Sequence, residues 1–94
     1  MFQISRSEND TVLLEGRLDA SQVETAAQIL DTINTSTVID FARLDYISSA
    51  GLGILLKTQK RLSTGGHSLK LINMNKMIRD VFRIARFDLI FKIE

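Results

Sequence analysis

Short apolar runs alternate with amphipathic helical stretches along most of the chain, and this alternation limits the folds that the sequence can adopt. Residues 37–41 and 68–72 are apolar runs of strand length, and each precedes a stretch with apolar residues at helical spacing. Strands that alternate with helices are joined by right-handed crossovers and form a mostly parallel sheet. The pattern therefore predicts an α/β domain.

The first part of the chain differs, because two strands follow one another directly. Residues 1–6 alternate weakly between apolar and polar side chains and predict a short edge strand. Residues 11–16 predict a second strand, and the polar stretch 7–10 between them has the composition of a turn. We therefore expect an antiparallel pair at the start of the sheet.

Three helices are predicted from apolar residues that share one face. The first opens where Ser21 and Glu24 have the spacing of a capping box. The second ends at Gly65 and Gly66, and the third follows the turn at residues 73–75. The inward-facing positions are Val23, Ala26, Ala27, Leu30 and Ile33 in the first helix, Leu52, Leu55, Leu56, Gln59 and Leu62 in the second, and Ile78, Val81, Phe82 and Ala85 in the third.

A last strand is predicted at residues 89–93, which completes the order β-β-α-β-α-β-α-β. A chain of 94 residues is long enough to bury one hydrophobic core. We therefore expect a single domain over residues 1–94, with a mixed, mostly parallel sheet that helices cover mainly on one face.

Charge and composition exclude several classes of partner. The net charge of +1 provides no general attraction to nucleic acid or to an anionic membrane. Cysteine is absent, which fits a reducing compartment. The N-terminus lacks the pattern of a signal peptide, and no run approaches the ~18 apolar residues of a membrane span. We expect a cytoplasmic protein with no direct contact to nucleic acid or membrane.

Residue types that commonly form catalytic or metal sites are sparse. The one histidine, His67, has no second histidine, cysteine or acidic cluster beside it. Gly51-x-Gly53 is too short for a dinucleotide-binding fingerprint, and no Gly-Lys-Ser/Thr follows it. We therefore predict that the protein is not an enzyme and that it needs no cofactor and no metal.

Basic residues form one stripe on the third predicted helix. Their spacing would suit a nucleic-acid or phospholipid contact, but Asp80 interrupts the stripe and no aromatic side chains lie between its members. A solvated helix face is the favoured interpretation. The stripe consists of Lys76, Arg79, Arg83 and Arg86.

The stretch from Tyr46 to Gly53 combines two hydroxyls with three small residues, between an apolar strand and a strongly periodic helix. A helix that begins there presents free backbone N–H groups and a positive dipole end beside Ser49. Such a position suits a serine that carries a phosphate. Alternatively, Ser48 or Ser49 caps the helix. Capping alone leaves the small residues that follow unexplained, because they weaken a helix start.

Several motifs together resemble the STAS domains of bacterial anti-sigma factor antagonists. Gly16-Arg17-Leu18-Asp19 before a helix is similar to the opening Gly-x-Leu-Asp of that family. The segments 38–41 and 44–53 are similar to its central strand and phosphorylation loop. Weaker matches are found at residues 69–73 and at Phe87-Asp88. The resemblance covers nearly the whole chain and implies a STAS-like domain.

The resemblance also implies a partner-switching cycle. In this family, an anti-sigma factor that is itself a serine protein kinase of the histidine-kinase-like ATPase fold phosphorylates a loop serine. A metal-dependent serine phosphatase removes the phosphate, and only the unphosphorylated form binds the kinase. The expected function is therefore that of an anti-sigma factor antagonist.

Matching the family motif backwards from Gly51-Leu52 assigns the acceptor to Ser49, with Ala50 as the small residue between them. Ser48 occupies the position where aspartate is common, so either serine remains a possible acceptor at this point. Asp19 matches a family acid that lies near the acceptor. The expected partner-binding residues are Asp19, Ser48, Ala50, Gly51, Leu52 and Gly53.

The alternative to this function keeps the same fold. A constitutive interaction subunit of a lipid-transport or multi-protein regulatory complex would use this domain without a phosphorylation switch. In either case we expect a monomer or a weak dimer.

Overall fold

The computed structural model describes residues 1–7 and 9–94, so Glu8 in the predicted turn lies outside the described residues. The predicted order of strands and helices is confirmed, with two short 3-10 helices, η1 and η2, in addition. The elements are β1 Phe2–Arg6, β2 Thr11–Leu18, η1 Ala20–Gln22, α1 Val23–Leu30, β3 Thr37–Ile47, α2 Ser49–Thr64, β4 Leu69–Ile72, α3 Lys76–Ile84, η2 Phe87–Leu89 and β5 Lys92–Ile93.

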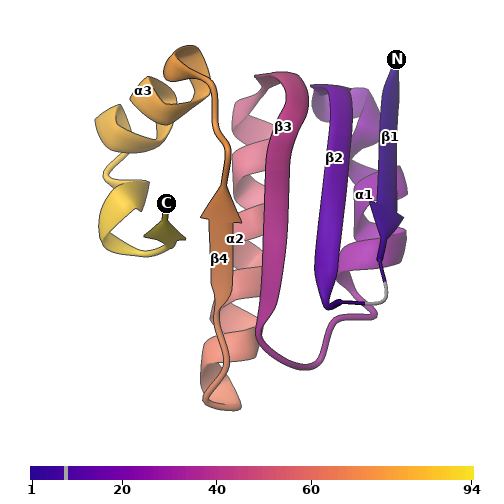
Figure 1. Cartoon of the computed structure of the whole chain (residues 1–94), viewed down its shortest axis with the longest axis vertical. Helices are drawn as coiled ribbons and strands as arrows, with labels where there is room; N and C mark the ends of the chain where they lie inside the picture. The colour runs from indigo at the N-terminus through magenta and orange to yellow at the C-terminus, as the bar shows by residue number, and fades with distance from the viewer. Residues whose placement is uncertain (8) are drawn as a thin grey trace.

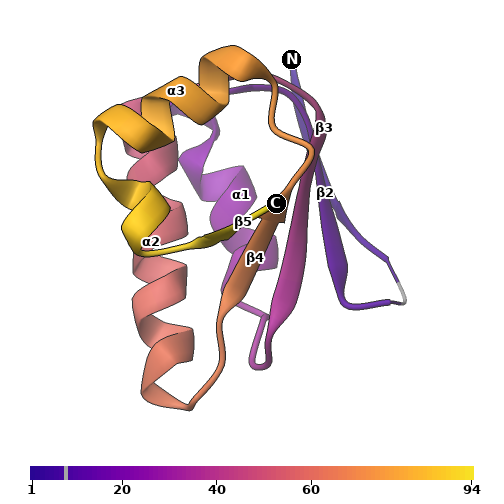
Figure 2. The same cartoon turned by 60° about the vertical axis from the view of Figure 1, so that its left-hand side comes forward.

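The strands form one mixed sheet in the order β1-β2-β3-β4-β5 (Figure 1). β1 is antiparallel to β2, and the pairs β2–β3, β3–β4 and β4–β5 are parallel. The helices lie on one side of the sheet, as the rotated view shows (Figure 2). The predicted fold class is therefore confirmed, and no helix among the described residues covers the other face of the sheet.

β3 is longer than the five residues expected at 37–41, because it continues to Ile47 with irregular pairing. Between its pairs with β2, three residue steps of β3 from Asp40 to Arg43 face two steps of β2 from Leu13 to Glu15. The Asp40 carboxylate accepts a hydrogen bond from the Ala42 N–H at 2.9 Å, which satisfies the backbone at this bulge. The bulge shifts the inward and outward alternation, which hid the second half of the strand in the sequence.

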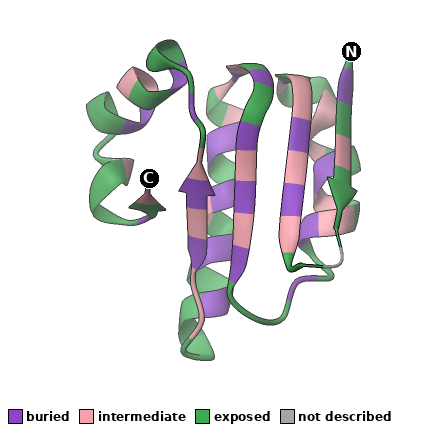
Figure 3. Cartoon of the chain, viewed as in Figure 1, coloured by how far each residue is buried: buried purple, intermediate pink, exposed green. Residues whose placement is uncertain are grey.

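The core lies between the sheet and its helices (Figure 3). Four phenylalanines close it at the C-terminal end. Phe82 of α3 is fully buried and meets Phe41 of β3, Phe87 and Phe91 edge-on, with ring centroids 5.9, 6.1 and 5.8 Å away. Edge-to-face contacts of this kind add to the free energy of burial. Phe82 therefore joins α3 and the last segment to the central strand.

The expected strand at residues 89–93 is wrong in extent, because only Lys92–Ile93 pairs with β4. Phe87 and Phe91 both turn toward Phe82, and η2 makes the turn that this requires. Leu89 and Ile90 are consequently exposed. Ala85 was expected to face inward, but it ends α3 and is exposed.

Two polar side chains of α2 fix this helix to its neighbours. The Arg61 guanidinium donates hydrogen bonds to the carbonyl of Ile33 at 2.8 Å, just beyond α1, and to that of Leu30 at 3.0 Å, the last residue of α1. The buried Gln59 carbonyl accepts a hydrogen bond from the Leu69 N–H at 2.7 Å. The C-terminal half of α2 is therefore tied to both α1 and β4.

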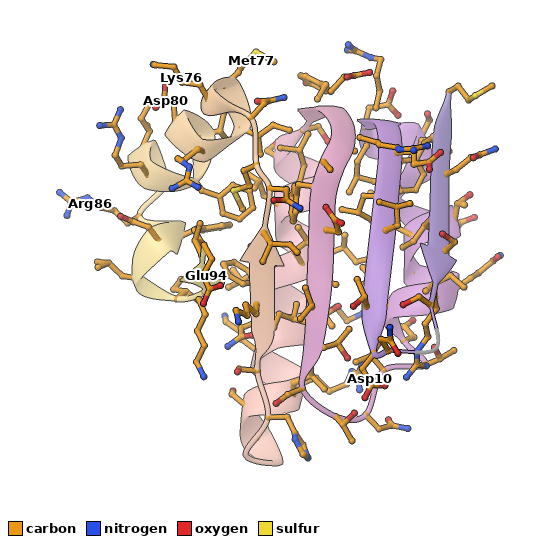
Figure 4. The ribbon with its side chains drawn as sticks, viewed as in Figure 1. Asp10, Lys76, Met77, Asp80, Arg86 and Glu94 are labelled. Carbon is orange, nitrogen blue, oxygen red and sulfur yellow. The ribbon has the colours of Figure 1, made fainter. Side chains whose placement is uncertain are left out.

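The predicted basic stripe is exposed, but it is wrong in extent, because Arg86 lies beyond the end of α3 (Figure 4). Lys76 and Arg83 contact the Asp80 carboxylate at 2.9 and 3.2 Å. The pKa of Asp80 is lowered, first by the hydrogen bond from Lys76 and then by the charges of Lys76 and Arg83. Part of the positive charge of the stripe is thus neutralised within the helix itself.

We expect Phe82→Ala to lower the free energy of unfolding by about 3–5 kcal/mol, because it leaves a cavity among three aromatic rings. Ile84→Ala, two residues away, removes a side chain that is 78% exposed, and we expect a change within about 0.5 kcal/mol. Urea denaturation followed by circular dichroism measures both. Equal losses in the two variants would contradict the anchoring role of Phe82.

Candidate functional site

The candidate site lies where β2 and β3 end side by side. Leu18 and Ile47, the last residues of the two parallel strands, are in register, and the Ser48 N–H donates a hydrogen bond to the Leu18 carbonyl at 2.9 Å. Asp19 and Ser48 therefore follow at the same edge of the sheet, where η1 and α2 begin (Figure 1). The fold brings together two of the residues that the sequence singled out, although 28 positions separate them.

Ser48 is the N-cap of α2. Its backbone is extended, with φ −89° and ψ 171°, and its hydroxyl oxygen accepts a hydrogen bond from the Gly51 N–H at 3.2 Å. This bond satisfies one of the free N–H groups of the first helical turn. The structure thus explains Ser48 by a folding role, which the sequence left open between the two serines.

Ser49 is the first residue of α2, and it is exposed. Within the described part of the chain, its hydroxyl has no hydrogen-bond partner. The first turn of α2 also contains no acidic residue. The Ser49 hydroxyl is therefore accessible at the positive end of a helix dipole, with no carboxylate in the same turn to oppose a negative charge.

The small residues after Ser49 have different reasons to be small. A Cβ atom on Gly51 would lie 2.9 Å from Ile47 Cγ1 and 2.9 Å from Leu18 Cγ, so only glycine lets α2 approach the strand ends this closely. Gly53 is exposed, and a Cβ atom there would meet no atom within 4 Å. Gly51 is therefore needed for packing, whereas Gly53 is not.

The expected partner-binding residues divide accordingly between interior and surface. Gly51 and Leu52 are buried against the protein's own core and shape the turn from within. Ala50 is half-buried at the start of the helix, and Gly53 lies one turn further on at the surface. The accessible part of the predicted surface comprises Asp19, Ser48, Ala50 and Gly53, with Ser49 among them.

The capping box expected from Ser21 and Glu24 is wrong, because Asp19 caps this end. Asp19 Oδ1 accepts hydrogen bonds from the Ser21 N–H at 3.0 Å and from the Ser21 hydroxyl at 2.6 Å. α1 itself begins after Gln22, whose side chain makes no capping hydrogen bond. The contacts of Asp19 lower its pKa, the hydroxyl bond most strongly, then the backbone bond and the charge of Arg17.

The sequence interpretation missed a contact beside the site. The Arg17 guanidinium carbon lies 4.3 Å from the centre of the Tyr46 ring, in a cation–π arrangement across the paired ends of β2 and β3. Arg17 also lines a hollow of about 410 Å³ on the face of the sheet that no helix covers. Both residues stand within the two motifs already noted, but only the strand register shows that they meet.

Other kinds of site find little support in the described residues. No group of three or more histidine, cysteine, aspartate or glutamate side chains among them is arranged to hold a metal ion. None of the helices in residues 1–7 and 9–94 has the length and apolar character needed to cross a membrane.

Fold and site together define a small α/β domain that presents a serine at a helix start, beside the ends of two parallel strands. A family model described as "Mlab, STAS domain" matches residues 2–92. The chain therefore belongs to the STAS domain family.

Individual relatives agree with this family. The "Putative anti-sigma factor antagonist BtrV" of Bordetella bronchiseptica is 40% identical over 72 residues, which are 77% of this chain and 61% of that protein's length. The anti-sigma factor antagonist SpoIIAA, solved in its unphosphorylated form, is 26% identical, with a TM-score of 0.78 over 100% of this chain and 88% of that one. The phosphorylated form of Bacillus SpoIIAA is 24% identical and has the same fold, with a TM-score of 0.72 over 100% of this chain and 91% of that one.

We expect opposite effects from alanine at the two glycines of this turn. Gly51→Ala lowers the free energy of unfolding by about 1–3 kcal/mol, because its Cβ overpacks the strand ends. Gly53→Ala raises it by about 0.5–1 kcal/mol, because alanine suits an open helical position better than glycine does. Urea denaturation of both variants distinguishes these effects. A loss of stability in Gly53→Ala would contradict the assignment.

The lowered pKa of Asp19 predicts a dependence of stability on pH. A carboxyl whose pKa is lower in the folded state stabilises the fold above its unfolded pKa of about 3.9, and this contribution disappears as pH falls through the folded value. We expect thermal unfolding midpoints between about pH 6 and pH 2 to fall more steeply for the wild type than for Asp19→Asn, which keeps a capping oxygen. Parallel curves for the two proteins would exclude this contribution.

Proposed function

We propose that this protein is an anti-sigma factor antagonist that works by partner switching, with Ser49 as the phosphorylated residue. The proposal rests on the different positions of the two neighbouring serines. Ser48 is bound as the N-cap of α2, whereas the Ser49 hydroxyl is exposed at the same helix start. The relatives BtrV and SpoIIAA support the role. The match spans 61% of the length of BtrV, so we propose the activity and the partners of this chain together with its role.

A phosphate on Ser49 is compatible with the fold. Phosphorylation transfers the terminal phosphoryl group of ATP to the Ser49 oxygen, releases ADP and the hydroxyl proton, and adds a charge of about −1.5 to −2 near neutral pH. Free N–H groups and the dipole at a helix N-terminus favour such a charge. Ser49 is exposed, so the group needs no displacement of core side chains. We therefore expect both forms to be folded, which fits the shared fold of phosphorylated SpoIIAA.

The proposed partners are an anti-sigma factor with serine kinase activity and a serine phosphatase. The anti-sigma factor docks on the surface formed by Asp19, Ala50 and Gly53, where small side chains allow its backbone to come close. The domain itself acts as a binding protein. Its output is the release of whatever the anti-sigma factor holds.

Phosphorylation ends this complex by changing the surface. A dianion on Ser49 would occupy space against the docked partner and oppose any acidic group that faces it. Juxtaposed like charges at an interface cost several kcal/mol, and every ~1.4 kcal/mol weakens binding tenfold. A phosphate is therefore sufficient to dissociate a complex of micromolar affinity.

The test incubates the protein and ATP with the candidate kinase, a histidine-kinase-like ATPase to be sought among the neighbouring genes, and follows the reaction by intact-mass and peptide analysis. We expect one phosphate on the wild type and none on Ser49→Ala. Ser48→Asp is the matched control, because aspartate caps a helix as well as serine does and replaces the neighbouring hydroxyl by a carboxylate that cannot be phosphorylated in the same way. Ser48→Asp should still be modified. Full modification of Ser49→Ala would overturn the assignment.

A second candidate function is a constitutive interaction subunit without a switch. The observation in its favour is that the matching family model is described by Mlab rather than by an anti-sigma factor antagonist. Binding of Ser49→Asp to the same ATPase, measured by calorimetry, separates the two functions. Partner switching predicts at least a tenfold loss of affinity, whereas a constitutive subunit predicts an unchanged value.

A further inference from the structure

Arg17 is a cation among acids that does not pair with them. Glu15, two residues earlier on β2, contacts the Arg43 guanidinium at 3.7 Å. Asp19, two residues later, has its Oδ1 occupied by two hydrogen bonds from Ser21. Within the described residues, Arg17 forms no salt bridge, and it is exposed. Its guanidinium is therefore free to bind an anion.

The Arg17 guanidinium packs against the ring of Tyr46 instead of pairing with an acid. The guanidinium carbon lies 4.3 Å from the ring centre, and a stacked guanidinium keeps the N–H groups at its edge available. A cation–π contact at an exposed site is weak compared with a bidentate bond to a phosphate. Tyr46 therefore holds the Arg17 guanidinium in a defined position, and an anion that binds the guanidinium more strongly than the ring does can displace it.

Arg17 also lies close to the candidate phosphorylation site. Arg17 and Tyr46 are paired in register at the ends of β2 and β3, and Ser49 follows Tyr46 by three residues. Three residues of chain span about 10 Å at most, and Arg17 lies one strand spacing of about 4.8 Å beside Tyr46, so the long side chains of arginine and phosphoserine can extend toward each other across this gap. The charge of Arg17 reaches this edge already, because it contributes to the lowered pKa of Asp19, after the stronger effect of Ser21.

We propose that Arg17 is the internal receptor for the phosphate on Ser49, and that phosphorylation moves its guanidinium from the Tyr46 ring to the phosphate oxygens. This inference rests on the proposed function of Ser49. In this scheme Arg17 binds the phosphate after it has been transferred and takes no part in the transfer. Its movement exposes the Tyr46 ring and reshapes the adjoining hollow, so the chemical change at the sheet edge also alters the uncovered face of the sheet.

Other cations fit this role less well. Arg43 lines the same hollow but is held by Glu15. Lys76 and Arg83 are paired with Asp80 on α3, which lies beyond β4 and away from β1 and β2 (Figure 1). Arg17 thus differs from its neighbours in being both unpaired within the described residues and next to the edge.

The experiment places phosphoserine at position 49 during translation, so that no kinase is required. Phosphorus NMR then follows the second ionisation of the phosphate, which has a pKa of about 6 in a free phosphoserine. We expect Arg17→Ala to raise this pKa by about 0.5–1 unit relative to the protein with Arg17, because a nearby cation favours the dianion. Arg43→Ala is the matched control and should leave the pKa unchanged.

The charged groups that face Arg17 are common to these proteins. Glu15, Asp45 and the N-terminal ammonium of Met1 lie beside Arg17 around the same hollow in every variant, and the lowered pKa of Asp19 keeps its carboxylate ionised over a titration from about pH 5 to pH 8. Equal phosphate pKa values with and without Arg17 would overturn the proposal. An equal change in Arg43→Ala would do so too, because it would indicate a general field rather than a specific receptor.

A second readout follows the ring that Arg17 leaves. Tyr46 is the one tyrosine of the chain, and the chain has no tryptophan, so its fluorescence reports on this contact alone. We expect acrylamide to quench Tyr46 more strongly in the phosphoserine protein than in the unmodified one, and equally in both forms of Arg17→Ala. Unchanged quenching on phosphorylation of the Arg17 protein would contradict the movement.

The test of Arg17 and the test of the proposed function can fail independently of each other. If the kinase modifies another residue, the proposed function fails while the phosphoserine protein still shows whether Arg17 binds a phosphate at position 49. If the kinase modifies Ser49 but the phosphate pKa ignores Arg17, the proposed function stands and the inference on Arg17 fails. Arg17 is exposed, so Arg17→Ala should remain folded, which its circular dichroism checks.

Discussion

The close approach of α2 to the ends of β2 and β3 is the contact on which the site depends. Gly51 meets Leu18 and Ile47 at a distance that admits no side chain, while the Ser48 N–H binds the Leu18 carbonyl. These contacts set the point at which the helix begins. They also determine which hydroxyl is used inside the fold and which is left outside, since moving the helix start by one residue would exchange the two serines.

The order of elements could be predicted from the sequence because most of the apolar spacing is regular. Each helix has apolar residues at helical spacing, and members of these sets such as Leu30, Leu55 and Ile78 are buried as expected. The predictions failed where a local contact overrides a pattern. Asp19 takes the capping position from Ser21 by binding its hydroxyl. The aromatic cluster around Phe82 turns the last apolar run into a 3-10 helix, although its composition is typical of a strand.

The candidate site was only partly readable in the sequence, for a different reason. Asp19 and Ser48 are named by short motifs, but the motifs do not say which hydroxyl is free, because an N-cap is defined by backbone geometry. The small residues are equally ambiguous on their own. Gly51 and Gly53 look alike in the sequence, and only their surroundings show that one faces the core and the other faces solvent. The contact between Arg17 and Tyr46 depends on strand register, which the bulges of β3 make hard to infer.

The hydrogen bonds from Arg61 and Gln59 have a consequence for how information can leave this domain. They tie the far half of α2 to the end of α1 and to β4, while Gly51 seats its near end on the strands. A helix that is held at both ends resists translation along its axis and tilting against the sheet. A chemical event at its first residue is therefore not carried along the helix to its far end, and a protein that responds to it must contact the start of α2 or the neighbouring ends of β2 and β3.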